Sequence, residues 1–93
     1  MPQYLIERNI PGVGNIGYDE LVKISKRSNE VLAELSSEGK QVEWQQSYVA
    51  GDKIYCVYNA PNEEAVREHA KRGPFPANLI VPISEVISPA TGK

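Results

Sequence analysis

The sequence predicts an α+β fold in which one antiparallel sheet carries two helices on one face. Period-two alternation over 42–48 precedes an apolar run at 54–58, and the hairpin signal Gly51-Asp52 lies between them. Apolar residues recur at helical spacing over 18–38 and over 63–72. With a strand at each end of the chain, the element order is βαββαβ. This order is the split βαβ, or ferredoxin-like, arrangement, in which the first and third strands are usually central.

The first half of the chain supplies a strand, a loop and the longer helix. Residues 3–8 have the composition of a strand, and the glycines and proline of 9–17 indicate a loop. The helix over 18–38 ends at Gly39. Its expected inner face consists of Leu21, Ile24, Ser28, Val31, Leu32 and Leu35.

The second half supplies the hairpin, the shorter helix and the last strand. Along 42–48, one face of the strand is expected to carry Val42, Trp44, Gln46 and Tyr48. Asn62 is placed to cap a helix over 63–72. The inner face of this helix should consist of Ala65, Val66, His69 and Ala70. A last strand over 79–87 is interrupted at Pro82, which favours an edge strand or a bulge. We therefore expect a single domain over residues 1–93, with 88–93 as a loose tail.

The strand at 54–58 also predicts a partner. Every residue of this run is apolar, as in strands that are buried on both faces. Two helices can cover only one face of the sheet. A second copy of the chain is the simplest cover for the other face, so we expect a homodimer joined through the sheet face away from the helices.

Composition narrows the class of protein. The hydrophobic content is 41%, and the formal net charge is −2, without the basic excess of a nucleic-acid-binding protein. No apolar run is long enough to cross a membrane, and the N-terminal residues do not resemble a signal peptide. The one cysteine excludes an intrachain disulfide. We expect a cytoplasmic protein that binds neither nucleic acid nor membrane.

The segment 12–17 matches the pattern G-x-G-x-x-G, which occurs in dinucleotide-binding sites. Its context opposes that function. The preceding strand carries Glu7 and Arg8, Pro11 opens the loop, and the chain is too short for a doubly wound sheet. We expect a flexible loop and no nucleotide cofactor.

Two titratable residues are candidates for a functional site. His69 is the only histidine, and no first-choice metal ligand lies three or four residues from it in the helix. A metal at His69 would need help from a strand or a second subunit; the alternative is a rim histidine that is hydrogen-bonded to a neighbour. Glu7 lies in a central strand and could act as a base, a metal ligand or half of a salt bridge. Arg8 points to the opposite face and is not its partner.

The remaining candidates are a thiol and phenols. Cys56 lies in the middle of a strand, and we expect it to act as a small apolar residue. The tyrosines of the hairpin are expected in the core or an interface, although a phenol such as that of Tyr55 could orient a ligand at a pocket wall.

Several sequence blocks are distinctive. They are Tyr4-Leu5-Ile6-Glu7-Arg8, Ser47-Tyr48-Val49, Asp52-Lys53-Ile54-Tyr55-Cys56-Val57-Tyr58, Ala60-Pro61-Asn62-Glu63-Glu64, Arg67-Glu68-His69-Ala70 and Gly73-Pro74-Phe75-Pro76-Ala77-Asn78. Over about residues 4–87 the chain resembles a bacterial family of small proteins long catalogued as of unknown function. One studied member is described as a nickel-binding dimer with a ferredoxin-like fold and metal at its surface. The resemblance implies nickel as a ligand, and the matching blocks offer His69, Glu7, Glu64 and Glu68 as candidate metal ligands.

Two classes of function follow. The first, which we favour, is a small dimeric nickel-binding protein without catalytic activity. The second is a small enzyme or small-molecule-binding module of the dimeric α+β barrel type, with a pocket formed by Glu7, Tyr55 and His69 as candidate catalytic residues. If Glu7 and His69 share that pocket, the pKa of His69 should lie above about 6.5.

Overall fold

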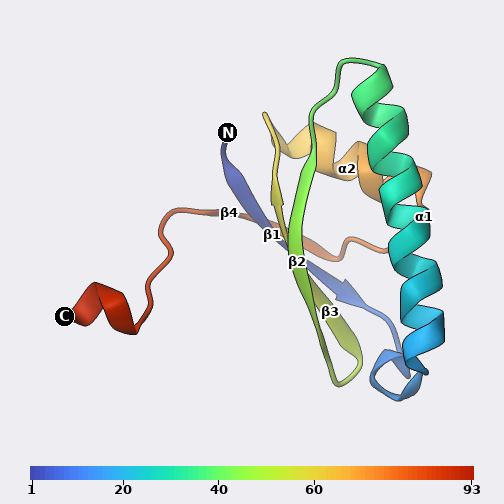
Figure 1. The fold of residues 1–93 in the computed structure, drawn as a ribbon, viewed down its shortest axis with the longest axis horizontal. Helices are drawn as coiled ribbons and strands as arrows, with labels where there is room; N and C mark the ends of the chain where they lie inside the picture. Colours follow the sequence, from blue (N-terminus) through green and yellow to red (C-terminus); the bar gives the residue numbers. More distant parts are fainter.

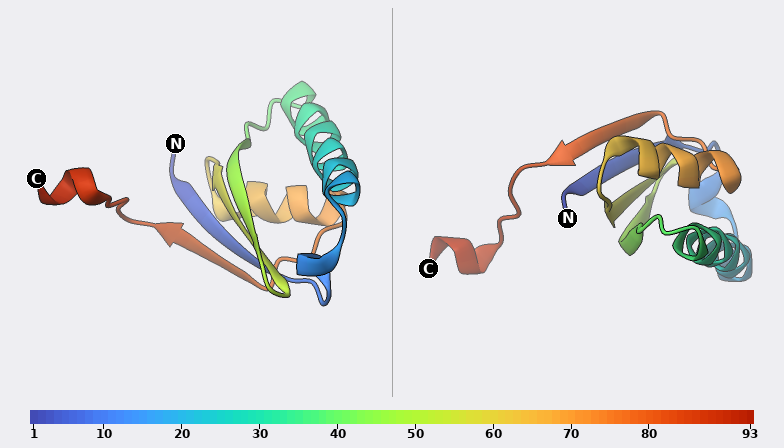
Figure 2. Two further views of the ribbon diagram at one scale, coloured as in Figure 1. Left: turned by 60° about the horizontal axis from the view of Figure 1, so that its bottom comes forward. Right: turned by 90° about the horizontal axis from the view of Figure 1, so that it is seen from above.

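The computed structural model describes residues 1–93 and shows a four-stranded antiparallel sheet with both helices on one face (Figures 1 and 2). In chain order the elements are β1 (Gln3–Asn9), the 3₁₀ helix η1 (Val13–Asn15), α1 (Tyr18–Ser37), β2 (Glu43–Ala50), β3 (Lys53–Asn59), α2 (Glu63–Arg72), β4 (Leu79–Ile83) and the 3₁₀ helix η2 (Pro89–Gly92). The strand order is β2-β3-β1-β4, with the first and third strands central. The predicted ferredoxin-like α+β fold is confirmed.

Strand register separates the residues of the two sheet faces. Ile6 of β1 lies opposite Cys56 of β3 and Ile80 of β4, and all three are buried beneath the helices. Their neighbours on the other face include Leu5 and Val81, which lie opposite each other and are 37% and 39% exposed. In β3, Tyr55 and Val57 lie on this second face and are half-buried, so the run at 54–58 has apolar side chains on both faces of the sheet, as predicted. The helices cover one face only, and the other is open.

The regular alternation predicted along 42–48 is interrupted by a bulge. Trp44 lies opposite Tyr58, but the next paired residue, Gln46, lies opposite Val57. Gln45 is the extra residue, and it reverses the phase of the strand. Trp44 and Ser47 therefore face the helices. Gln46 and Tyr48, which the sequence placed on the same face as Trp44, face the open side.

The helices begin and end close to the predicted residues. Asn62 caps α2 through a hydrogen bond from the Ala65 backbone N–H to its side-chain oxygen at 2.9 Å. The predicted inner face of α2 is buried throughout. At the far end of α2, the Arg72 guanidinium donates to both carboxylate oxygens of Glu38, at 2.6 and 2.7 Å, and so ties the C-terminal ends of the two helices together.

The glycine-rich segment 12–17 packs against the hairpin between β2 and β3. The backbone N–H of Gly12 donates to the Asp52 carboxylate at 3.0 Å, and the Ile10 N–H donates to the Asp52 carbonyl at 2.8 Å. A Cβ atom on Gly14 would lie 2.5 Å from the Gly51 carbonyl oxygen. The expected flexible loop is thus a short 3₁₀ helix held against a turn, and its glycines permit close backbone packing.

The last strand is shorter than predicted. It ends at Ile83, which lies opposite Gln3, the first residue of β1. Pro82 lies in this edge strand, as its sequence position indicated. The chain continues away from the body of the molecule into η2, where Ser88 and Thr91 form a capping box (Figure 1). Neither α-helix is both long and apolar enough to cross a membrane.

Replacing Gly14 with Ala should destabilise the fold, because the new methyl group would overlap the Gly51 carbonyl. We expect a loss of about 1–3 kcal/mol in the free energy of unfolding, as for other overpacked positions. Urea denaturation measures this change. Gly17→Ala is the matched control, because nothing lies within 4 Å of a Cβ there. Equal stability of the two variants would contradict the close packing.

Candidate functional site

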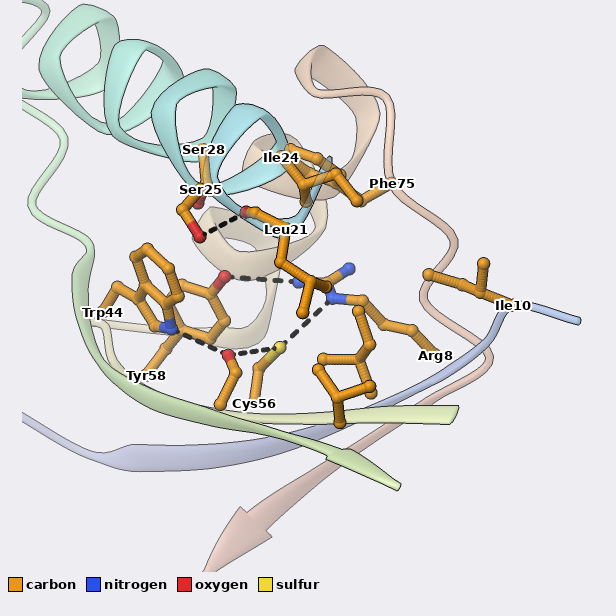
Figure 3. A pocket seen from close by; sticks show the side chains of 13 residues that line it. Arg8, Ile10, Leu21, Ile24, Ser25, Ser28, Trp44, Cys56, Tyr58 and Phe75 are labelled. Carbon is orange, nitrogen blue, oxygen red and sulfur yellow. Dashed lines mark hydrogen bonds between the residues drawn. The ribbon is translucent and has the colours of Figure 1, made fainter. Parts of the chain in front are cut away.

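A cavity of about 170 Å³ lies between α1 and the sheet, on the side of β2 and β3 (Figure 3). Most of its lining is apolar. The lining residues are Arg8, Ile10, Leu21, Ile24, Ser25, Ser28, Trp44, Ser47, Val49, Ile54, Cys56, Tyr58 and Phe75. The bulge in β2 contributes to this wall, because the residues that it turns toward the helices include Ser47 and Val49.

Arg8 supplies the only charge in the lining. It follows Ile6 by two residues in a central strand, so its side chain points beneath the helices and is only 3% exposed. Its guanidinium donates to the Pro76 carbonyl at 2.8 Å, and to the Tyr58 hydroxyl and the Cys56 sulfur at 3.4 Å each. The guanidinium is therefore fixed at the floor of the cavity by three neutral acceptors.

No carboxylate compensates this charge. No Asp or Glu oxygen lies within the 4.0 Å of an ion pair with Arg8, and none lines the cavity. The faces of two aromatic rings offset part of the desolvation of the guanidinium, whose carbon lies 5.9 Å from the Tyr58 ring centroid and 5.6 Å from that of Phe75. Arg8 is a buried cation without an anion.

A chain of polar groups crosses the cavity floor. The Trp44 indole N–H donates to the Ser47 hydroxyl at 2.8 Å, and that hydroxyl donates to the Cys56 sulfur at 2.9 Å (Figure 3). Cys56 is buried, as expected, but its sulfur also accepts a hydrogen bond from Arg8. These bonds hold the side chains of β1, β2 and β3 in register and fix the indole as one wall of the cavity.

His69 of α2 is fully buried, and its side chain points toward Ser28 of α1. Its Nε2 lies 3.1 Å from the Ser28 hydroxyl, whereas its Nδ1 has no hydrogen-bond partner. The ring packs against the rings of Tyr58 and Phe75, at centroid distances of 5.1 and 5.5 Å. Burial, reinforced by the positive charge of Arg8, lowers the pKa of His69 to about 4. The expected pKa above 6.5 is wrong, because the imidazole is buried and its charged neighbour is a cation. The expected position at the rim is wrong as well, because His69 lies inside the fold.

Glu7 and Tyr55 lie on the other side of the sheet. They are opposite each other in the pairing of β1 with β3, on the open face. The Glu7 carboxylate accepts a hydrogen bond from the Lys53 ammonium at 3.0 Å, and this contact raises the pKa of Lys53. The expected pocket of Glu7, Tyr55 and His69 is therefore not formed, because the sheet separates His69 from the other two. Glu7 instead forms the salt bridge that was its alternative interpretation.

Glu64 and Glu68 lie one helical turn apart on α2. Both line a groove of about 440 Å³ that also includes Gln41 and Asn62. Glu68 accepts a hydrogen bond from Arg72 at 2.9 Å, whereas Glu64 is exposed and forms no ion pair. No group of three or more His, Cys, Asp or Glu side chains in the chain is placed to hold a metal ion. These two carboxylates are the only candidate metal ligands from the sequence that lie together beside a groove.

Sequence reasoning missed the principal member of the site, Arg8. Strand alternation points Arg8 to the face opposite Glu7, which excludes it as a partner for that carboxylate. The same alternation places it beside Ile6 in the core, where an arginine is rare. A second signal was Ser28, the only polar residue in the predicted apolar stripe of the long helix. Both signals mark polar groups beneath the helices, although neither indicates a cavity.

Comparison with known proteins identifies one family. The family model described as nickel responsive protein SCO4226-like matches residues 4–83. No curated protein matches the chain. Among solved structures, the crystal structure of SCO4226 from Streptomyces coelicolor A3(2) matches with a TM-score of 0.74 and 21% sequence identity, covering 91% of this chain and 99% of that chain. At this identity the structural likeness establishes the fold.

The environment of His69 predicts how stability depends on pH. The unfolded imidazole takes up a proton near pH 6.5, but the folded one does so only near pH 4. Wild type should therefore lose stability relative to His69→Phe as the pH falls from 6.5 to 4, by about 3 kcal/mol in total. Above pH 6.5, the difference between the two proteins should be constant.

Urea denaturation at a series of pH values measures this difference. Both proteins carry the same carboxylates, so the carboxylate titration cancels in the comparison. Parallel stability profiles between pH 6.5 and 4 would show that the folded imidazole takes up its proton as readily as the unfolded one.

Proposed function

Because the chain belongs to the SCO4226-like family of nickel-responsive proteins, we propose that it acts as a non-catalytic homodimer that binds divalent nickel weakly at its surface. The observation that carries the proposal is the family match, which spans both central strands and both helices. The single buried cysteine supports a reducing compartment such as the cytoplasm as its place of action.

The open sheet face supports the dimer. Leu5, Val81 and Leu79 lie on neighbouring central and edge strands, and all three are partly exposed. A contiguous apolar surface of this kind favours association, and a two-fold axis would place the same strands of two chains face to face. The Glu7–Lys53 ion pair lies on this face as well and would supply a polar contact within the interface.

The candidate metal-ligating side chains of one chain could bind nickel weakly, but they are too few for a tight site. His69 is buried away from the surface, and Glu7 is bound by Lys53. Glu64 is exposed and free of ion pairs, whereas Glu68, one turn away beside the same groove, pairs with Arg72 and would bind a metal in competition with that arginine. Nickel prefers imidazole nitrogen but also accepts carboxylate and water, so a site with two carboxylates would keep most of its ligands as water.

The arrangement of titratable groups supports a role without catalysis. No carboxylate lines the cavity to act as a base, and His69 is not among the lining residues. A neutral buried imidazole with no acidic partner lacks the orienting group of the usual acid–base pairs. Glu7 and Tyr55, the other candidate catalytic residues, face away from the cavity.

Changing Val81 to Glu should separate the dimer, because the substitution places a carboxylate among the apolar side chains of the open face, opposite Leu5. Light scattering should give about twice the chain mass for wild type and a single chain mass for Val81→Glu. Tyr18→Ser is the control, since Tyr18 is an exposed aromatic residue at the start of α1, away from this face, and the variant should remain dimeric. A monomeric wild type at micromolar concentration would overturn the proposed dimer.

The double variant Glu64→Gln/Glu68→Gln should lose most of the nickel binding seen by calorimetry at neutral pH, because it removes both carboxylates of the groove. The control is Glu30→Gln/Glu34→Gln, which removes two exposed carboxylates at the same spacing from α1. His69→Phe should bind nickel like wild type. Absence of heat at millimolar nickel, or loss of binding in His69→Phe alone, would contradict the proposed site.

A further inference from the structure

The cavity beneath α1 contains a charge that the protein leaves uncompensated. Arg8 is only 3% exposed, and no carboxylate lines the cavity around it. A charge in such a place is expensive unless it is paired. The contacts with Tyr58 and Phe75 are weak substitutes for an anion, so the site favours any anion that can enter.

The guanidinium also retains hydrogen-bonding capacity. It has five N–H groups, of which three have protein acceptors, one each on Nε, Nη1 and Nη2. One N–H on each terminal nitrogen is therefore left without a protein acceptor. Each free N–H group can donate a charge-assisted hydrogen bond to a carboxylate oxygen.

The rest of the cavity suits an apolar body. The residues at the floor, including Arg8 and Cys56, are almost fully buried, whereas Val49 at the rim is 41% exposed. Leu21, Ile24 and Trp44 form walls between the two (Figure 3). A cavity of about 150 Å³ with apolar walls is large enough for benzene, so this one, at about 170 Å³, can hold a group of about that size.

We propose that this cavity binds a small organic carboxylate, with the carboxylate on Arg8 and an apolar body the size of a single ring against Trp44 and Ile24. One cation and no other charge in the lining match a monoanion, whereas a phosphate dianion would leave one negative charge buried without a partner. The inference is independent of nickel and of the dimer, because it rests on the helix side of the sheet in one chain.

Trp44 provides the measurement, because it is the only tryptophan of the protein and lies in the cavity wall. Its fluorescence is followed while benzoate or phenylacetate is added, with benzamide as the neutral analogue of the same shape. Both acids should give a saturable change, and benzoate should bind at least about tenfold more tightly than benzamide, since only the acid pairs with the guanidinium.

Two variants test the placement. Arg8→Met keeps a long side chain without the charge and should weaken benzoate binding at least about tenfold, while benzamide binding is unchanged or stronger. Ser25→Phe fills the cavity with Arg8 in place and should abolish binding of both. Arg67→Met is the control, since Arg67 lies on the exposed side of α2 and pairs with Glu63, and this variant should bind like wild type.

Several results would overturn the inference. No saturable change with either acid would show that the cavity takes no such ligand. Equal affinity for benzoate and benzamide would show that the charge of Arg8 is not used. Unchanged benzoate binding in Arg8→Met would place the acid elsewhere. If Arg8→Met does not fold, Ser25→Phe decides, and benzoate binding that survives in this variant also overturns the proposal.

Discussion

Burial of the Arg8 guanidinium between the sheet and the helices is the constraint on which the helix side of the molecule depends. A charge at 3% exposure requires hydrogen-bond acceptors, which are Tyr58 and Cys56 of β3 and the Pro76 carbonyl of the loop after α2. The bond to Pro76 joins the loop after α2 to the central strand. Burial lowers the pKa of His69, and the charge of Arg8 lowers it further, so the imidazole is a neutral packing residue beneath the helices.

Strand alternation places neighbouring residues of β1 on opposite faces of the sheet. Glu7 and Arg8 are adjacent in the chain, but the sheet lies between their side chains, so neither neutralises the other. Glu7 pairs with Lys53 on the open face, where we place the second copy of the chain. Arg8 faces the cavity, where we place an organic anion. Metal, dimer and organic ligand would therefore occupy three separate surfaces of one small fold.

Much of the fold could be predicted from periodicity, and much of the site could not. Helix α2 and its Asn62 cap followed from local pattern, and the central position of β3 followed from its apolar run. The bulge at Gln45 was hidden because the surrounding residues are polar and fit either phase of the strand. Arg8 was visible as an arginine on a core face, but its lack of a carboxylate partner depends on contacts between elements far apart in the sequence. His69 was correctly placed on the inner face of its helix, but its lowered pKa reflects burial first and the charge of Arg8 second, and neither can be seen in the local pattern.

The most direct test of this account is the pKa of His69, measured by NMR titration of its imidazole in wild type and in Arg8→Met. If an uncompensated guanidinium lies beneath the helices, the wild-type value should be about 4, and removal of the charge should raise it part of the way toward 6.5. Burial alone would still hold it below 6.5 in the variant. A wild-type value near 6.5, or one that does not change in Arg8→Met, would contradict the account.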